Sequence, residues 1–126
     1  MELTSVLALQ FPNGIVADGQ QHIVEWTNPE TCTIKIKKTL IWCGMSKGQI
    51  SDFGAHLVTI PGGLYVSVVG WDHYCDPTGL HQFVNDFHGD HMSLKVGEKL
   101  RLIAFATSEN VPPGNGGVVV WVWYGK

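Results

Sequence analysis

Hydrophobic and polar residues alternate with a period of two along most of this chain. The alternating segments are rich in Val, Ile, Thr, Tyr and Trp, and turns containing glycine or proline separate them. This pattern predicts β-strands rather than helices. The expected strands lie near His22 to Thr27, Ile34 to Cys43, Phe53 to Ile60, Leu64 to Trp71, Lys99 to Thr107 and Gly117 to Tyr124.

The strand expected from Ile34 to Cys43 has two different faces. Its even positions are apolar except for Lys38, and its odd positions begin with Lys35 and Lys37. A lysine within an apolar face predicts a β-bulge or a break in the strand at Lys38. The three lysines form a short basic stripe, which is typical of a solvated strand face or of a protected sheet edge.

A hairpin is expected between the strands near Phe53 to Ile60 and Leu64 to Trp71. Pro61 and Gly62 separate them, and this pair suits the two central positions of a type II turn. No segment shows the helical spacing of apolar residues over three turns, and the nearest approach, Leu80 to Phe87, is short. We therefore expect little helix.

The expected fold class is all-β. Six to eight strands at regular spacing indicate an antiparallel β-sandwich or barrel, because two half-apolar sheets must cover each other. A chain of 126 residues is the length of one domain, so we expect a single β-sandwich domain over residues 1–126.

The last expected strand, Val118 to Tyr124, is apolar on both faces. Two interpretations remain open. It is either a central strand whose outer face is covered by a loop or by the N-terminal segment, or it faces another subunit. In the second case Val119, Trp121 and Trp123 are the candidate interface residues.

The charge content is low for a small domain. Only 15% of the residues are charged and the formal net charge is −3, which argues against a phosphate-binding surface and hence against nucleic-acid partners. Either uncharged polar residues or a partner subunit must therefore cover much of the surface.

Targeting and cysteine features indicate a soluble protein folded in the cytoplasm. We expect neither a signal peptide nor membrane insertion, since the apolar runs are short and the start lacks a basic region. Three cysteines without a CxxC pair argue against a disulfide framework.

The order of strands and loops near the C-terminus gives the chain a limited resemblance to a known group of proteins. A turn and an amphipathic strand from Val96 to Ala106 precede a Gly/Pro-rich loop and the closing strand from Gly117 to Tyr124, with a weaker match at residues 24–29. This resembles single jelly-roll proteins, which include viral capsid and virion-appendage sandwiches and the trimeric heads of the C1q and tumour-necrosis-factor type. The resemblance implies a jelly-roll subunit that assembles with copies of itself, often as a trimer, and that is in some cases virion-associated. No functional residue carries over from it.

Histidines and carboxylates are concentrated between His81 and His91. If three or four of these side chains came together, they could bind zinc or non-haem iron. The spacing is not that of a cupin, because no His-x-His pair is present and no histidine follows His91. We therefore expect no cofactor, and we interpret these side chains as making hydrogen bonds within turns. The alternative is that they bind a divalent metal in a cupin-like enzyme. The candidate ligands are His81, His88, Asp90 and His91.

An aromatic cluster beside carboxylates suggests a shallow sugar site, where rings stack on the sugar and polar groups bond its hydroxyls. Its members are Trp71, Asp72, His73 and Tyr74. If Trp71 and Tyr74 are buried, they are instead the end of a core strand. The sequence shows no nucleophile elbow.

The leading functional hypothesis is therefore a non-catalytic jelly-roll structural or attachment protein that acts by self-assembly and loop presentation. The alternatives are a carbohydrate-binding module and a cupin-like metal-dependent enzyme.

Overall fold

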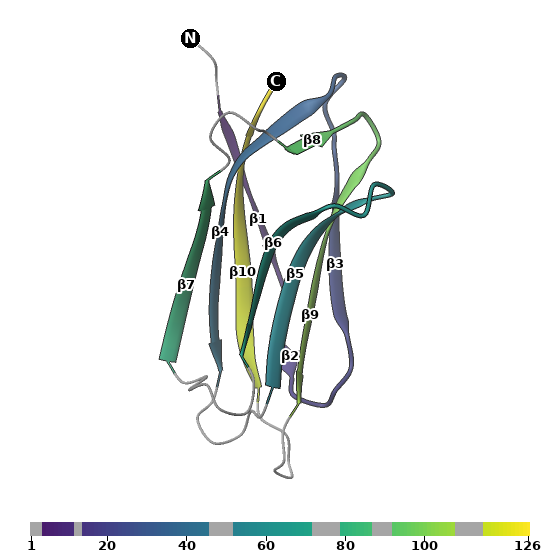
Figure 1. The fold of residues 1–126 in the computed structure, drawn as a ribbon. Coiled ribbons are helices and arrows are strands. Elements are labelled where there is room, and N and C mark those ends of the chain that lie inside the picture. Colours follow the sequence, from purple (N-terminus) through teal and green to yellow (C-terminus); the bar gives the residue numbers. More distant parts are fainter. Residues whose placement is uncertain (1–3, 12–13, 46–51, 72–78, 87–91, 108–114) are drawn as a thin grey trace.

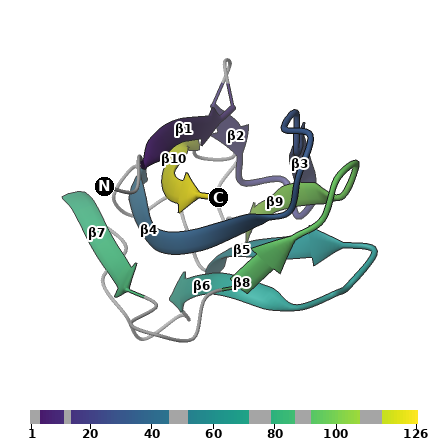
Figure 2. The same cartoon turned by 90° about the horizontal axis from the view of Figure 1, so that it is seen from above.

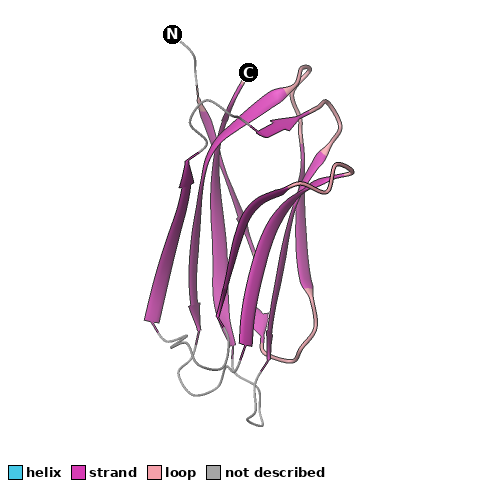
Figure 3. Cartoon of the chain, viewed as in Figure 1, coloured by secondary structure: helices cyan, strands magenta, loops and turns pink. Residues whose placement is uncertain are grey.

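The computed structural model describes residues 4–11, 14–45, 52–71, 79–86, 92–107 and 115–126. All regular structure in these ranges is β-strand, and Figure 3 shows no helix among them. The all-β expectation is confirmed. The strands are β1 (Ser5–Gln10), β2 (Ile15–Val16), β3 (His22–Thr27), β4 (Ile34–Met45), β5 (Asp52–Ile60), β6 (Tyr65–Trp71), β7 (Gly79–Asp86), β8 (Met92–Leu94), β9 (Lys99–Thr107) and β10 (Asn115–Gly125).

The strands form two antiparallel sheets that pack face to face (Figures 1 and 2). Sheet A has the order β1-β10-β4-β7, with β2 added beside β10 and β8 beside β4, and sheet B has the order β3-β9-β5-β6. The first and last long strands are therefore neighbours, and the chain crosses repeatedly between the sheets. The eight strands of the two main paths form a jelly roll, as the resemblance implied, and β2 and β8 are additions to it.

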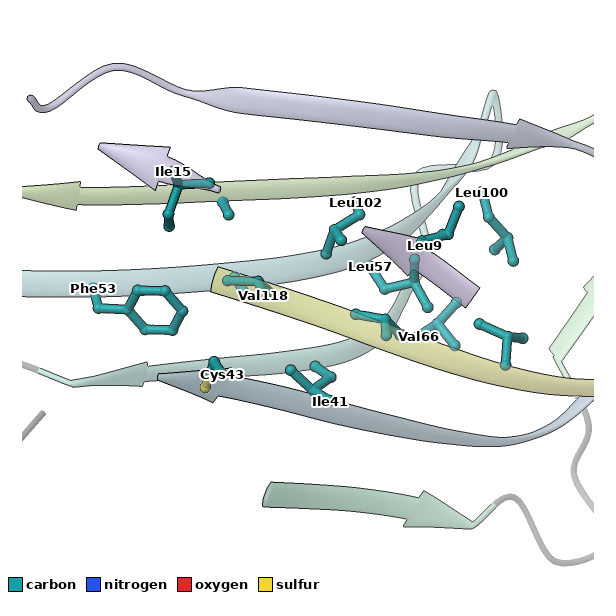
Figure 4. Close-up of a cluster of buried hydrophobic side chains, with 14 of the residues drawn as sticks. Leu9, Ile15, Ile41, Cys43, Phe53, Leu57, Val66, Leu100, Leu102 and Val118 are labelled. Atoms are coloured by element: carbon teal, nitrogen blue, oxygen red, sulfur yellow. The ribbon is translucent and has the colours of Figure 1, made fainter. Parts of the chain in front are cut away.

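The core lies between the inward faces of the two sheets. Sheet B contributes alternate residues of β5 and β9, and sheet A contributes the inward residues of β4 and β10. Figure 4 shows Phe53 and Leu57 on one side of this layer and Val118 and Ile41 on the other. Because side chains alternate along a strand, every second residue points into this core and the residues between point to the outer faces.

A β-bulge divides β4 into two parts. Lys38 pairs with Trp123, but Tyr124 pairs with Ile36, so Lys37 is the extra residue. The bulge lies where the second neighbour of β4 changes from β8 to β7. Of the bulge or break predicted at Lys38, the structure has a bulge, one residue earlier at Lys37. The bulge reverses the side on which odd and even positions lie.

This reversal corrects the predicted faces of the strand. Ile34 and Ile36 are buried before the bulge, whereas the odd residues Ile41 and Cys43 are buried after it. Leu40 and Trp42 therefore do not share the buried face of Ile34, although the sequence alternation groups them with it.

Two connections between the sheets meet at one end of the sandwich. The side-chain amide of the buried Asn28 donates to the carbonyl oxygens of Cys32 and Leu94 at 3.1 and 3.0 Å, and its oxygen accepts from the Glu30 backbone N–H at 2.9 Å. The Asn28 backbone N–H donates to the Glu98 carbonyl at 2.9 Å. One residue thus links the β3–β4 connection to the β8–β9 turn.

The β5–β6 hairpin is confirmed, but its turn is not type II. The Ile60–Pro61 peptide is cis, and the positive φ of 72° falls at Gly63 rather than at Gly62. Three hydrogen bonds close the turn. The Thr59 N–H donates to the Leu64 carbonyl, the Gly63 N–H donates to the Thr59 carbonyl, and the Leu64 N–H donates to the Thr59 hydroxyl.

Four strands have no counterpart among the expected ones, namely β1, β2, β7 and β8. The segment that came nearest to a helical pattern, Leu80 to Phe87, instead supplies most of β7. Pairing with β4 over Lys38 to Met45 determines its conformation, so tertiary context overrides a weak local pattern here.

Candidate functional site

The last strand, β10, lies in the middle of sheet A between β1 and β4. Val118, Val120 and Val122 point into the core and are buried. Val119, Trp121 and Trp123 are half-buried on the opposite face. The N-terminal strand β1 pairs alongside β10 and does not lie over it.

The central row of the outer face of sheet A is apolar across four strands. Cross-strand partners share a face, so the register groups Val6 with Trp123, and Ala8 with Trp121 and Leu40. The row through Leu40 continues to Val84 of β7, which is 54% exposed. The most central row of this face therefore contains no charged residue.

A groove of about 340 Å³ lies on this face, lined by Leu40, Trp42, Trp121 and Trp123. We call it the tryptophan groove. The Trp42 and Trp121 rings meet edge to face with their centroids 5.5 Å apart. The Lys38 ammonium lies 4.9 Å from the centroid of the Trp123 ring, which is a cation–π distance. The groove is thus aromatic, with one cation at its rim.

Two groove residues, Leu40 and Trp42, were not among the sequence candidates. The bulge turns them outward, since the residues after Lys37 lie on the opposite face from the one that simple alternation gives. The available signal was Lys38, a lysine in an otherwise apolar row. Counting the alternation again from Lys38 places Leu40 and Trp42 beside it on the outer face.

The groove is lined by aromatic and aliphatic side chains. None of its four lining residues is an acid, a base or a nucleophile. The nearest thiol in sequence, Cys43, is buried on the inward face, and burial raises its pKa from 9.0 to about 11. A thiol in that state is a poor nucleophile.

The metal candidates fall mostly outside the described residues. His88, Asp90 and His91 lie outside them, and His81 is known by its backbone, which pairs with Cys43 in sheet A. Within the described ranges, no group of three or more His, Cys, Asp or Glu side chains is placed to hold a metal ion. The metal site stays a prediction.

The sugar-site candidates lie just beyond β6. Trp71 is the last residue of this strand and its backbone pairs with Phe53, while Asp72, His73 and Tyr74 lie outside the described residues. The carbohydrate site also stays a prediction. In the part of the chain that the structure describes, no helix has the length and apolar character needed to cross a membrane.

Neither a known family model nor a curated protein matches the chain. Solved structures do. A protein of the Bacillus endospore appendages, described as disulfide-linked pili, has a TM-score of 0.51 at 9% identity over 98% of this chain and 87% of that one. Dimeric latent PorU from Porphyromonas gingivalis has a TM-score of 0.58 at 9% identity over 99% of this chain.

The chain spans 13% of the PorU chain. A third match is the decameric BFDV capsid protein, with a TM-score of 0.48 at 9% identity over 100% of this chain and 99% of that chain. The predicted likeness to an appendage sandwich is confirmed at the level of architecture. At such low identity the comparisons establish the fold and not the function: the chain is a jelly-roll β-sandwich.

Proposed function

We propose that this chain is a non-catalytic structural subunit that assembles with further copies of itself through the outer face of sheet A. The role is of the appendage or virion type. The contact residues include Val119, Trp121 and Trp123, and a trimer is one of the expected copy numbers. Assembly through a sheet face leaves the loops at both ends of the sandwich available for presentation to other molecules.

The observation that carries this proposal is the composition of one sheet face. The inward face of sheet A already supplies the core, yet its outward face also presents three tryptophans from two neighbouring strands. Apolar side chains extend from there to Val6 and Val84 on the edge strands, which are 51% and 54% exposed. A contiguous apolar face of this kind is typical of an interaction surface.

The residues around this face follow the anatomy of an interface. Lys38 lies at its rim and Gln10 is exposed on the edge strand, whereas the row through Ala8, Trp121 and Leu40 is uncharged. Apolar centres with polar rims, enriched in Trp, characterise protein–protein contacts. The fold is compatible with this role, since the Bacillus appendage protein that shares it is described as forming pili.

Sedimentation velocity over a wide range of protein concentrations tests the proposal. We expect the mean mass to rise with concentration above the 13.9 kDa of one chain. Trp121→Glu and Trp123→Glu place a charge in the centre of the contact, and we expect each to raise the dissociation constant by about 30-fold or more.

The matched control is Ile23→Glu. Ile23 is 49% exposed on the outer face of sheet B, so it receives the same charge on a comparable strand position away from the proposed contact. We expect its mass distribution to match that of the unchanged protein. A wild-type chain that stays monomeric, with solubility and stability unaltered by either tryptophan substitution, would refute the proposal.

A further inference from the structure

The tryptophan groove is concave, and this constrains what can cover it. If two copies met groove to groove, the two hollows would face each other and leave a shared apolar void of up to twice about 340 Å³. Voids forfeit the dispersion contacts of the side chains that line them. A better occupant is a convex apolar feature.

Such a feature lies at the tip of the β5–β6 hairpin. Leu64 is 56% exposed and Tyr65 is 66% exposed, which makes Tyr65 the most exposed large hydrophobic residue in the described part of the chain. We call these two residues the knob. Exposed neighbouring apolar residues on a hairpin tip leave water when they enter a groove.

The knob is held in place before any contact is made. The Leu64 N–H donates to the Thr59 hydroxyl at 3.2 Å, and the Leu64 carbonyl accepts from the Thr59 N–H at 3.0 Å. The Tyr65 ring packs edge to face on His56, with the ring centroids 5.7 Å apart. An ordered knob loses little conformational entropy on binding.

The charges of the two features are compatible. The segment from Ile60 to Tyr65 has no charged residue, so its insertion buries no charge beside Lys38 at the groove rim. The phenolic oxygen of Tyr65 can also accept a hydrogen bond from the Lys38 ammonium, and its ring offers a second cation–π face.

Groove and knob belong to different sides of the molecule. The groove lies on the outer face of sheet A, and the knob is on the hairpin that joins two strands of sheet B. Figure 2 shows the β5–β6 turn projecting on the side away from β1, β10 and β7. A contact between two different surfaces is head-to-tail, so it generates rings or open filaments rather than an isolated two-fold dimer.

From this geometry we infer that the knob of one copy inserts into the tryptophan groove of the next copy, head to tail. The inference rests on the proposed function and names the second surface of the same contact. Its occupant is the β5–β6 turn of an identical chain.

The central apolar row and the groove beside it lie within about 400 Å², the area of three residue rows on four strands at the usual strand and residue spacings. A stable pair of proteins buries about 800 Å² on each partner. One contact between knob and groove is therefore small, and we expect assembly only at high protein concentration. In a head-to-tail assembly each copy takes part in two such contacts, one through its groove and one through its knob.

Two variants separate the surfaces. Trp121→Ser removes one wall of the groove, and the double substitution Leu64→Ser with Tyr65→Ser removes the knob. Val96→Ser is the matched control, because Val96 is 57% exposed on a different turn. In sedimentation velocity we expect the groove and knob variants to be monomeric where the unchanged protein assembles, and the control to assemble normally.

Mixing the two variants gives the decisive measurement. The groove variant retains a knob and the knob variant retains a groove, so an equimolar mixture should form one contact and then stop. We expect a single species of twice the 13.9 kDa chain mass. Circular dichroism of each variant establishes that it is folded, and Trp42→Ser is the second groove variant if Trp121→Ser does not fold.

The outcomes distinguish this inference from the proposed function. If the groove variant is monomeric but the knob variant still assembles, the contact is not head-to-tail and the inference is wrong, while self-assembly through sheet A stands. A mixture that stays monomeric also overturns the inference. Wild-type protein that is monomeric at every concentration overturns both.

Discussion

Asn28 is the residue through which one end of the sandwich is held together. Its side chain uses both amide hydrogens and its oxygen, and its backbone N–H binds Glu98. Only an amide offers two donors and an acceptor in this geometry. Because the residue is 4% exposed, water cannot replace a lost partner without rearrangement.

We predict that Asn28→Asp destabilises the fold more than Asn28→Ala does. Alanine leaves the Cys32 and Leu94 carbonyls without this donor, at a cost of about 2 kcal/mol. Aspartate also places a buried carboxylate against those carbonyls, which adds further cost. Denaturant unfolding measures both, with the exposed Thr27→Ala as control. Equal stability of the two variants would contradict this account.

The buried thiol of Cys43 makes the free energy of unfolding depend on pH. Burial raises its pKa from 9.0 to about 11, so between these values the unfolded chain releases a proton that the folded chain retains. The free energy of unfolding is unaffected by this thiol below pH 9 and falls as the pH rises towards 11.

We predict that this decrease is on the order of 2 kcal/mol when the pH reaches 11. Cys43→Val removes the titrating group at a similar size. The stability of that variant should decline less steeply between pH 9 and 11 than the stability of the unchanged protein. Parallel declines in the two proteins would assign the pH dependence to other groups.

At the scale of elements, alternation located the long strands but not the face each residue occupies. The strands from His22, Phe53 and Lys99 lie where the pattern places them, because one face of each packs in the core. In β4 the pattern indicated the bulge, but it did not show which residues on each side of the bulge point into the core. That depends on where β7 and β8 pair with the strand.

The candidate site shows the same division between local and long-range information. Trp121 and Trp123 could be predicted because β10 is apolar on both faces. Leu40 and Trp42 were missed, since their outward direction depends on the bulge in β4, for which Lys38 is the only signal in that strand. The β5–β6 turn was misassigned because a proline-glycine pair suits type II, whereas the positive φ lies one residue later.

The bulge yields a prediction about β4 as a whole. Without Lys37 the strand alternates regularly, and Ile34, Ile36, Ile41 and Cys43 all stay on the inward face, because Ile36 and Lys38 already pair with consecutive residues of β10. We therefore expect the chain to fold without Lys37, at a cost of less than about 3 kcal/mol for the lost bulge. Lys37→Ala keeps the bulge and should cost less than about 1 kcal/mol in the same thermal unfolding measurement. A deletion variant that does not fold would contradict this reading of the strand.

At the scale of the whole molecule, the proposed contact is apolar, and its thermodynamics should show this. Hydrophobic association weakens on cooling, whereas contacts between opposite charges weaken as salt rises. We predict that the mean mass measured by light scattering falls between about 30 and 5 °C and does not fall when sodium chloride is raised to about 1 M. Dissociation by salt at constant temperature would instead indicate a charged interface.

The extra residue in β4 also bears on how related chains should be compared with this one. A relative that lacks the bulge would be one residue shorter within a paired strand, not in a loop, where length differences are usually placed. An ungapped alignment across β4 would then match the buried Ile41 of this chain with an outward position of the relative. Comparisons should therefore allow a single gap at Lys37, and the residues on its two sides should be compared as two separate strands.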